Sequence, residues 1–228
     1  MTKSAPSRFL KDQNKPQLWL AMAANAVAIY AAAQWTDVTA FGLRGLLHGV
    51  IHLLPVGLAV LFTTVATSLI DVETKYRLVF LRWRHALPGH RAFTEYGPRD
   101  PRVDMSKVER LLGNKLPSDP DEQNAVWYGL FKRVENEPPV LGVHRDFLLL
   151  RDYAALAALF VPVFGGAAAF AVRPPAVLAV YMGLLLLQLF IVRAAASNCG
   201  KRFVATVLAE ASSICPPKVK KTSKPANP

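Results

Sequence analysis

Four apolar stretches constrain the fold of this chain more than any other feature. They cover residues 18–35, 46–70, 153–172 and 176–192. A helix needs about 20 apolar residues to cross the hydrocarbon core of a bilayer, with a range of roughly 17 to 25. Segments that cross lipid must be helical, because lipid offers the backbone no hydrogen-bond partners. The last two stretches also lack the polar stripe that a buried helix of a soluble bundle usually carries. We therefore expect an all-α integral membrane protein with four transmembrane helices.

Basic residues are distributed unevenly between the segments that join these stretches. Residues 1–17, 71–152 and 193–228 hold 25 Lys and Arg, whereas the two short loops between the paired spans hold only Arg44 and Arg173. Basic residues accumulate on the cytosolic side of membrane proteins. The distribution predicts two helical hairpins in a bacterial inner membrane, with both termini and the long middle region in the cytosol.

Residues 71–152 are expected to form a helical cytosolic domain inserted between the second and third spans. No helix-breaking residue separates the second span from Pro88, so we expect one helix to continue to that proline. The helix of the third span is expected to begin near Leu141 in the same way. Between them, Asp119 and Pro120 are typical of a helix start, as N-cap and first helical residue.

The chain ends are expected to be basic. Residues 1–17 should form a basic cytosolic N-terminus. The helix of the fourth span should extend through residues 193–215, because no breaker interrupts it. The lysine-rich residues 216–228 should be disordered, since they carry too few apolar side chains to form a core.

Three polar residues within the apolar stretches form a candidate intramembrane cluster. His48 and His52 are four residues apart and share one face of a helix, and Asn25 lies at a similar depth in the first stretch. Ionisable residues in a span usually face other helices. We expect interhelical hydrogen bonds here, with gating, proton sensing and haem binding as alternatives. Two histidines on one helix cannot hold both faces of a single haem, so haem would require a dimer. We expect no resident cofactor and no metal.

A second candidate site combines aromatic and charged residues of the middle region. Arginine side chains and aromatic faces together bind phosphate and base groups. The aromatic and charged residues of the middle region are therefore expected either to form an ion-paired, aromatic core or to line a site for a small anionic ligand or a cytosolic protein. The candidate residues are Trp127, Tyr128, Lys132, Arg133, His144, Arg145 and Arg151.

The arginines that follow the second span are candidates for contact with the membrane surface. Arg77, Arg82 and Arg84 are expected to lie against anionic lipid headgroups, where each basic residue contributes about 1 kcal/mol. Residues 71–152 hold 14 basic and 13 acidic side chains. This balance argues against nucleic acid as a partner, because binding to phosphate backbones needs a positive surface.

The functional hypotheses follow from this organisation rather than from a catalytic motif. The chain contains no nucleotide-binding fingerprint, P-loop, HExxH or nucleophile elbow, so we expect no enzymatic activity. We expect a pore-forming or membrane-perturbing effector, or a receptor-like module, gated through its cytosolic domain and assembled as a homo-oligomer. The alternatives are a redox anchor subunit that uses His48 and His52, and a scaffold that recruits a cytosolic partner.

Overall fold

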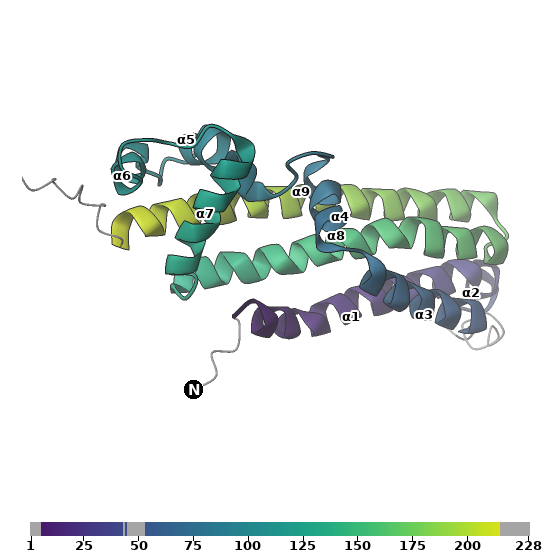
Figure 1. Cartoon of the computed structure of the whole chain (residues 1–228). Helices are drawn as coiled ribbons and strands as arrows, with labels where there is room; N and C mark the ends of the chain where they lie inside the picture. Colours follow the sequence, from purple (N-terminus) through teal and green to yellow (C-terminus); the bar gives the residue numbers. More distant parts are fainter. Residues whose placement is uncertain (1–5, 43, 45–52, 215–228) are drawn as a thin grey trace, which may run out of the picture. The chain divides into compact units, whose positions relative to one another are not determined.

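The computed structural model describes residues 6–42, 44 and 53–214 of the chain. These residues form helices and turns, and no strand occurs among them. They divide into two compact units: unit 1 comprises Met1–Trp83 and Arg145–Asn198, and unit 2 comprises Arg84–His144 and Cys199–Pro228. The boundary crosses two long helices, α8 (Pro138–Ala171) and α9 (Pro175–Ile214), which run from teal through green to yellow in Figure 1.

Unit 1 contains the apolar helices. In addition to its parts of α8 and α9 it holds α1 (Pro6–Ala33), α2 (Trp35–Phe41), α3 (Leu53–Leu69) and α4 (Val72–Phe80). Helices α1, α8 and α9 are long and apolar enough to cross a membrane, and the number rises to four if α3 and α4 form one broken span. The core of unit 1 is formed by Met22, Ile29, Ala32, Ala59, Leu156, Phe160, Phe164, Ala168, Val172, Tyr181 and Leu185.

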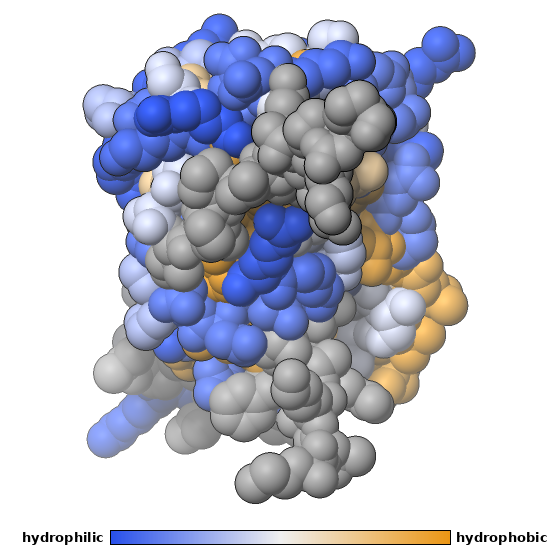
Figure 2. Space-filling view, turned by 60° about the vertical axis from the view of Figure 1, so that its left-hand side comes forward, coloured by the Kyte–Doolittle hydropathy of each residue, from blue (hydrophilic) through white to orange (hydrophobic). Residues whose placement is uncertain are grey.

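The surface of unit 1 is apolar to a degree that suits lipid. Exposed large side chains occur on α1, α3, α8 and α9, and include Leu20, Phe62, Phe170 and Phe190. In the described part of unit 2, by contrast, Tyr128 is the only exposed large hydrophobic side chain. In Figure 2 the largest hydrophobic area lies at one side of the view, and most of the other coloured residues are hydrophilic. Because a soluble protein rarely exposes so much apolar surface, the pattern is consistent with a membrane protein.

The predicted continuous helix from the second span to Pro88 is wrong. Helix α3 ends at Leu69, and α4 begins at Val72 after a bend of 100° between the two helices. The cause lies in Asp71, whose carboxylate accepts hydrogen bonds from the backbone N–H groups of Glu73 and Thr74. Asp71 therefore acts as an N-cap that starts a new helix, where the apolar pattern alone predicted continuation.

Helix α4 also ends earlier than predicted. Its C-cap, Leu81, takes the left-handed conformation, with φ 51° and ψ 46°. The chain then passes through His85, again with positive φ (49°), into a 3-10 turn over Pro88–Arg91 and a π-helical turn over Ala92–Tyr96. Residues 81–96 are therefore compact turns rather than a helical stalk.

Unit 2 packs short helices around an aromatic core. It contains α5 (Gly97–Arg99), α6 (Met105–Leu111) and α7 (Pro120–Val134), together with the start of α8 and the end of α9. The predicted start of α7 is confirmed, since the Asp119 carboxylate accepts hydrogen bonds from the N–H groups of Asp121 and Glu122. The uninterrupted helices predicted around the third and fourth spans are also confirmed, with α8 beginning at Pro138 and α9 continuing to Ile214.

Candidate functional site

A cavity of about 370 Å³ opens in unit 1 between residues of α1, α3, α4 and α8. We call it the Lys75 pocket. One part of its lining is apolar and the other part is charged or hydroxylic, so the pocket is amphipathic. The hydroxyls of Thr64, Thr67 and Ser68 donate to carbonyls of their own helix and keep their oxygens as acceptors. The lining consists of Lys15, Leu18, Trp19, Met22, Thr64, Thr67, Ser68, Lys75, Asp152 and Leu156.

The charged groups at this pocket do not balance. Lys75 Nζ lies 3.3 Å from Asp152 Oδ1, and Arg151 Nη2 lies 2.9 Å from the same oxygen. Arg151 is buried, with 2% of its surface exposed, and its guanidinium carbon lies 5.4 Å from the centre of the Tyr76 ring. One carboxylate thus faces two cations. The other charged residue of the lining, Lys15, is exposed and pairs with Asp12.

The predicted cytosolic site is divided between the two units. Arg151 and Arg145 belong to unit 1, where Arg145 forms an exposed ion pair with Asp146. Trp127, Tyr128, Lys132, Arg133 and His144 belong to unit 2. The seven residues of the candidate site are therefore distributed over both units.

Within unit 2, Trp127 and His144 pack against other aromatic rings. Trp127 stacks on Phe131 with 5.9 Å between ring centres, and His144 stacks on Phe203 at 4.8 Å. The indole N–H of Trp127 donates to the carbonyl oxygen of Val204 at 3.4 Å. Trp127 is buried and His144 is half-buried, so both rings pack within unit 2.

The remaining members of the unit 2 set are at the surface. Lys132 Nζ lies 2.7 Å from Glu135 Oε2 and 5.6 Å from the centre of the Tyr128 ring. The hydrogen bond that Lys132 donates to the Glu135 carboxylate raises the pKa of the Lys132 ammonium. Arg133 lines a second, smaller cavity of about 340 Å³ beside α7. This group resembles a solvated, ion-paired helix face more than a binding site.

The other predicted residues are placed as follows. Asn25 is buried and donates to the carbonyl oxygen of Ala21 in its own helix at 2.9 Å. His48 and His52 lie outside the described residues, so the predicted intramembrane cluster stays a prediction. Of the arginines expected at the membrane surface, Arg77 pairs with Glu73 four residues earlier in α4, Arg82 is half-buried in unit 1, and Arg84 is exposed in unit 2.

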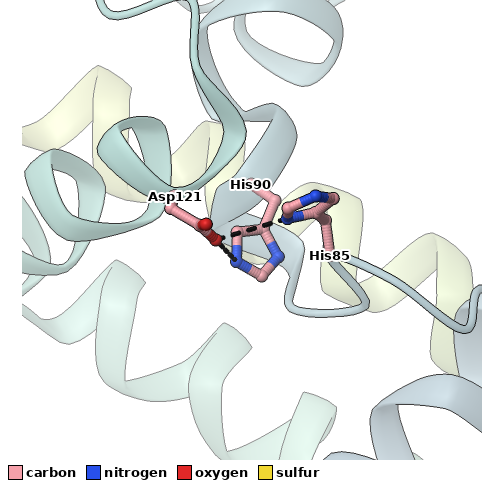
Figure 3. A group of neighbouring side chains, drawn as sticks. All are labelled: His85, His90 and Asp121. Carbon is pink, nitrogen blue, oxygen red and sulfur yellow. Dashed lines mark hydrogen bonds and ion pairs between the residues drawn. The ribbon is translucent and has the colours of Figure 1, made fainter.

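One cluster was missed by sequence reasoning. His85 Nδ1 and His90 Nε2 each lie 3.3 Å from Oδ1 of Asp121, and the two rings meet edge to face at 5.2 Å (Figure 3). His85 and Asp121 are exposed, whereas the His90 ring is buried. The spacing of the two histidines was visible in the sequence. Their meeting with a carboxylate about thirty positions later depends on tertiary packing, which no local pattern reports.

Comparisons of the chain with protein-family models, with curated proteins and with solved structures find no match.

Proposed function

We propose that the protein is a receptor-like, multi-pass membrane module that binds an anionic amphiphile in the Lys75 pocket and transmits its presence to unit 2. The observation that carries the proposal is the continuity of α8. This one helix bears Asp152, which lines the pocket and pairs with the adjacent Arg151, and it also bears His144, which stacks on Phe203 in unit 2. The residues between them include no glycine and no proline. Because packed helices shift as rigid bodies, displacement at one end of such a segment reaches the other.

The charge at the pocket supports an anionic ligand. Lys75 and Arg151 share Asp152, so a second negative group near Lys75 would neutralise the remaining positive charge. The Lys75 side chain is 14% exposed and the Asp152 side chain 16% exposed. Attraction to an anion is stronger there than at a fully solvated surface, because screening by water is weaker.

The shape and lining of the pocket support an amphiphile rather than a small ion. Trp19, Met22 and Leu156 offer an apolar wall for a hydrocarbon chain, next to the hydroxyls of α3 and the ammonium of Lys75. An anionic phospholipid combines both features. In the cytosolic leaflet such lipids are abundant and attract basic residues near the surface. We place the protein in a bacterial inner membrane as a homo-oligomer, with both termini in the cytosol.

The binding step is tested with the full chain in lipid nanodiscs. Short-chain phosphatidylglycerol is expected to bind, whereas its phosphatidylcholine counterpart and inorganic phosphate alone are expected to bind at least tenfold more weakly. Lys75→Met should abolish the preference, because the remaining Arg151–Asp152 pair is neutral. Lys107→Met is the control, since Lys107 is an exposed lysine of unit 2. Equal binding by wild type and Lys75→Met would reject the pocket.

The transmission step has its own measurement. Phosphatidylglycerol should slow hydrogen exchange at the amides of α7, which lies entirely in unit 2. A proline at Leu149, which removes a backbone donor and kinks α8 between His144 and Arg151, should eliminate this effect while binding persists. Binding without any change in α7 exchange would reject the receptor model.

Dye-loaded vesicles discriminate the receptor model from the pore hypothesis. A receptor-like module leaves the dye inside at every lipid composition, whereas a pore-forming effector releases it when the activating lipid is present. Release that depends on Lys75 would show that the pocket is real and that its output is permeability.

A further inference from the structure

We infer that His85, His90 and Asp121 form a binding site in unit 2 for a divalent transition-metal ion of the zinc class. The three side chains approach one another in the close-up of Figure 3, where the Asp121 carboxylate faces one nitrogen of each imidazole. One ligand atom from each residue lies within 4.8 Å of the other two.

The distances suit a shared ion after a small contraction. Bonds from zinc to imidazole nitrogen and carboxylate oxygen measure about 2.0–2.2 Å, so tetrahedral ligand atoms lie about 3.4 Å apart. Each histidine nitrogen is 3.3 Å from Asp121 Oδ1, which matches this spacing. Only the distance between the ligand nitrogens of His85 and His90 has to shorten. The His85 and Asp121 side chains, 42% and 74% exposed, have the freedom to move.

The backbone around the cluster is fixed by packing. His90 lies in the 3-10 turn that follows Pro88, and Gly89 of that turn is pressed against α7. A Cβ added to Gly89 would lie 2.8 Å from Cε3 of Trp127, so this close approach requires glycine. Asp121 lies in the first turn of α7, which Asp119 caps. The turn and the helix start are thus held together independently of any ion.

The chemistry of the donors indicates the class of metal. Two imidazoles and one carboxylate suit zinc, cobalt, nickel and ferrous iron, whereas calcium and magnesium prefer oxygen ligands alone. Three protein ligands leave one position of a tetrahedral ion for water or another group. Asp119, the N-cap of the same helix, adds negative charge nearby, which favours a cation.

One feature limits the expected affinity. Nδ1 of His90 is buried without a hydrogen-bond partner, while Nε2 faces Asp121. Metal-ligating histidines usually donate their second N–H to a carboxylate or carbonyl, and loss of such a partner weakens binding by about 10- to 100-fold. We therefore expect an affinity below that of a closed structural zinc site.

The test uses the full chain in detergent, purified without a histidine tag and stripped of metal with a chelator. Cobalt(II) is titrated and followed by its visible absorption, and zinc then displaces it. The expected result is one ion per chain. His85→Ala and Asp121→Asn should each weaken binding by at least about tenfold. Both side chains are exposed, so the fold of either variant should be retained.

Two controls make the result decisive. Glu122→Gln removes a neighbouring carboxylate of the same helical turn and should change the affinity less than twofold. The double variant His48→Ala/His52→Ala removes the other histidine pair and should bind as wild type does. Undiminished binding in Asp121→Asn, loss of binding in the double variant, or no cobalt absorption with wild type would each overturn the site.

Discussion

Arg151 donates two hydrogen bonds to its neighbour Asp152, from Nε at 3.1 Å and from Nη2 at 2.9 Å, both to Oδ1. The arginine is buried, and Lys75 approaches the same oxygen. In this trio, the Asp152 carboxylate is therefore the one negative charge that offsets the repulsion between Lys75 and Arg151. Its loss should affect unit 1 far more than the loss of either cation.

We expect Asp152→Asn to lower the free energy of unfolding by about 3–5 kcal/mol, the range measured when one partner of a buried pair is removed. Asp146→Asn, on the same helix, breaks an exposed pair with Arg145 and should cost at most about 1 kcal/mol. Lys75→Met should also be mild, because a neutral pair remains. Chemical unfolding of the protein in detergent measures all three variants. Equal effects of Asp152→Asn and Asp146→Asn would contradict the described charge cluster.

Two glycines of unit 2 should respond to alanine in opposite directions. At Gly89 an added Cβ would meet Trp127 at 2.8 Å and the Cα atom of Asn124 at 3.2 Å, so the 3-10 turn would have to separate from α7. Overpacking of this kind costs about 1–3 kcal/mol. At Gly129, in α7, the added Cβ would meet nothing within 4 Å. Alanine there should stabilise the helix by about 0.5–1 kcal/mol.

Thermal unfolding of the two glycine variants checks this prediction. Gly89→Ala should unfold at a lower temperature than wild type, and Gly129→Ala at a higher one. If Gly89→Ala unfolded at the same temperature as wild type, the turn and α7 would not be packed as described. The same result would mean that packing against α7 does not hold the turn that carries His90.

Local sequence signals predicted the start of α7 but missed the start of α4 and the long-range clusters. Asp119 and Pro120 predicted the start of α7 because capping depends on neighbours in the chain. The bend after α3 was missed although Asp71 uses the same chemistry, because the apolar positions continued beyond it. The sequence alone does not distinguish an aspartate that caps a helix from one whose carboxylate is solvated. Which one occurs depends on where the chain can turn.

The candidate sites were harder still. Arg151 was predicted either to belong to an ion-paired core or to line a ligand site, but its pairing with Lys75 through Asp152 requires α4 to lie against α8. The bend that sequence reasoning missed is what brings α4 there. His85 and His90 likewise depend on the turns after Leu81, where an extended helix was expected. Both arrangements were therefore missed for one reason, the prediction that the helix of the second span continues unbroken to Pro88.

Leu81 provides a test of that helix end. A leucine in the left-handed region costs about 1–2 kcal/mol, and this side chain is 65% exposed, so little packing would be lost on replacement. We expect Leu81→Gly to raise the stability by up to about 1 kcal/mol, less the entropy cost of glycine. Leu81→Val should lower it, because β-branched residues tolerate positive φ worst. If α4 instead continued as a helix through this position, glycine would be the destabilising change.

The number of membrane crossings is the last prediction. If the bent pair α3 and α4 contains a span, the chain crosses four times, and if it does not, three times. With three crossings, the basic residues 1–17 would lie on the opposite side from residues 71–137, against the 25-to-2 distribution of Lys and Arg. We therefore expect four crossings. The 17 residues of α3 span roughly 25 Å, close to the hydrocarbon thickness, which is sufficient if Asp71 marks the exit. Reporter fusions at Thr39 and Pro174 should then lie outside, and fusions at Pro98 and Pro228 inside. A fusion at Thr39 on the same side as one at Pro98 would establish the three-span arrangement instead.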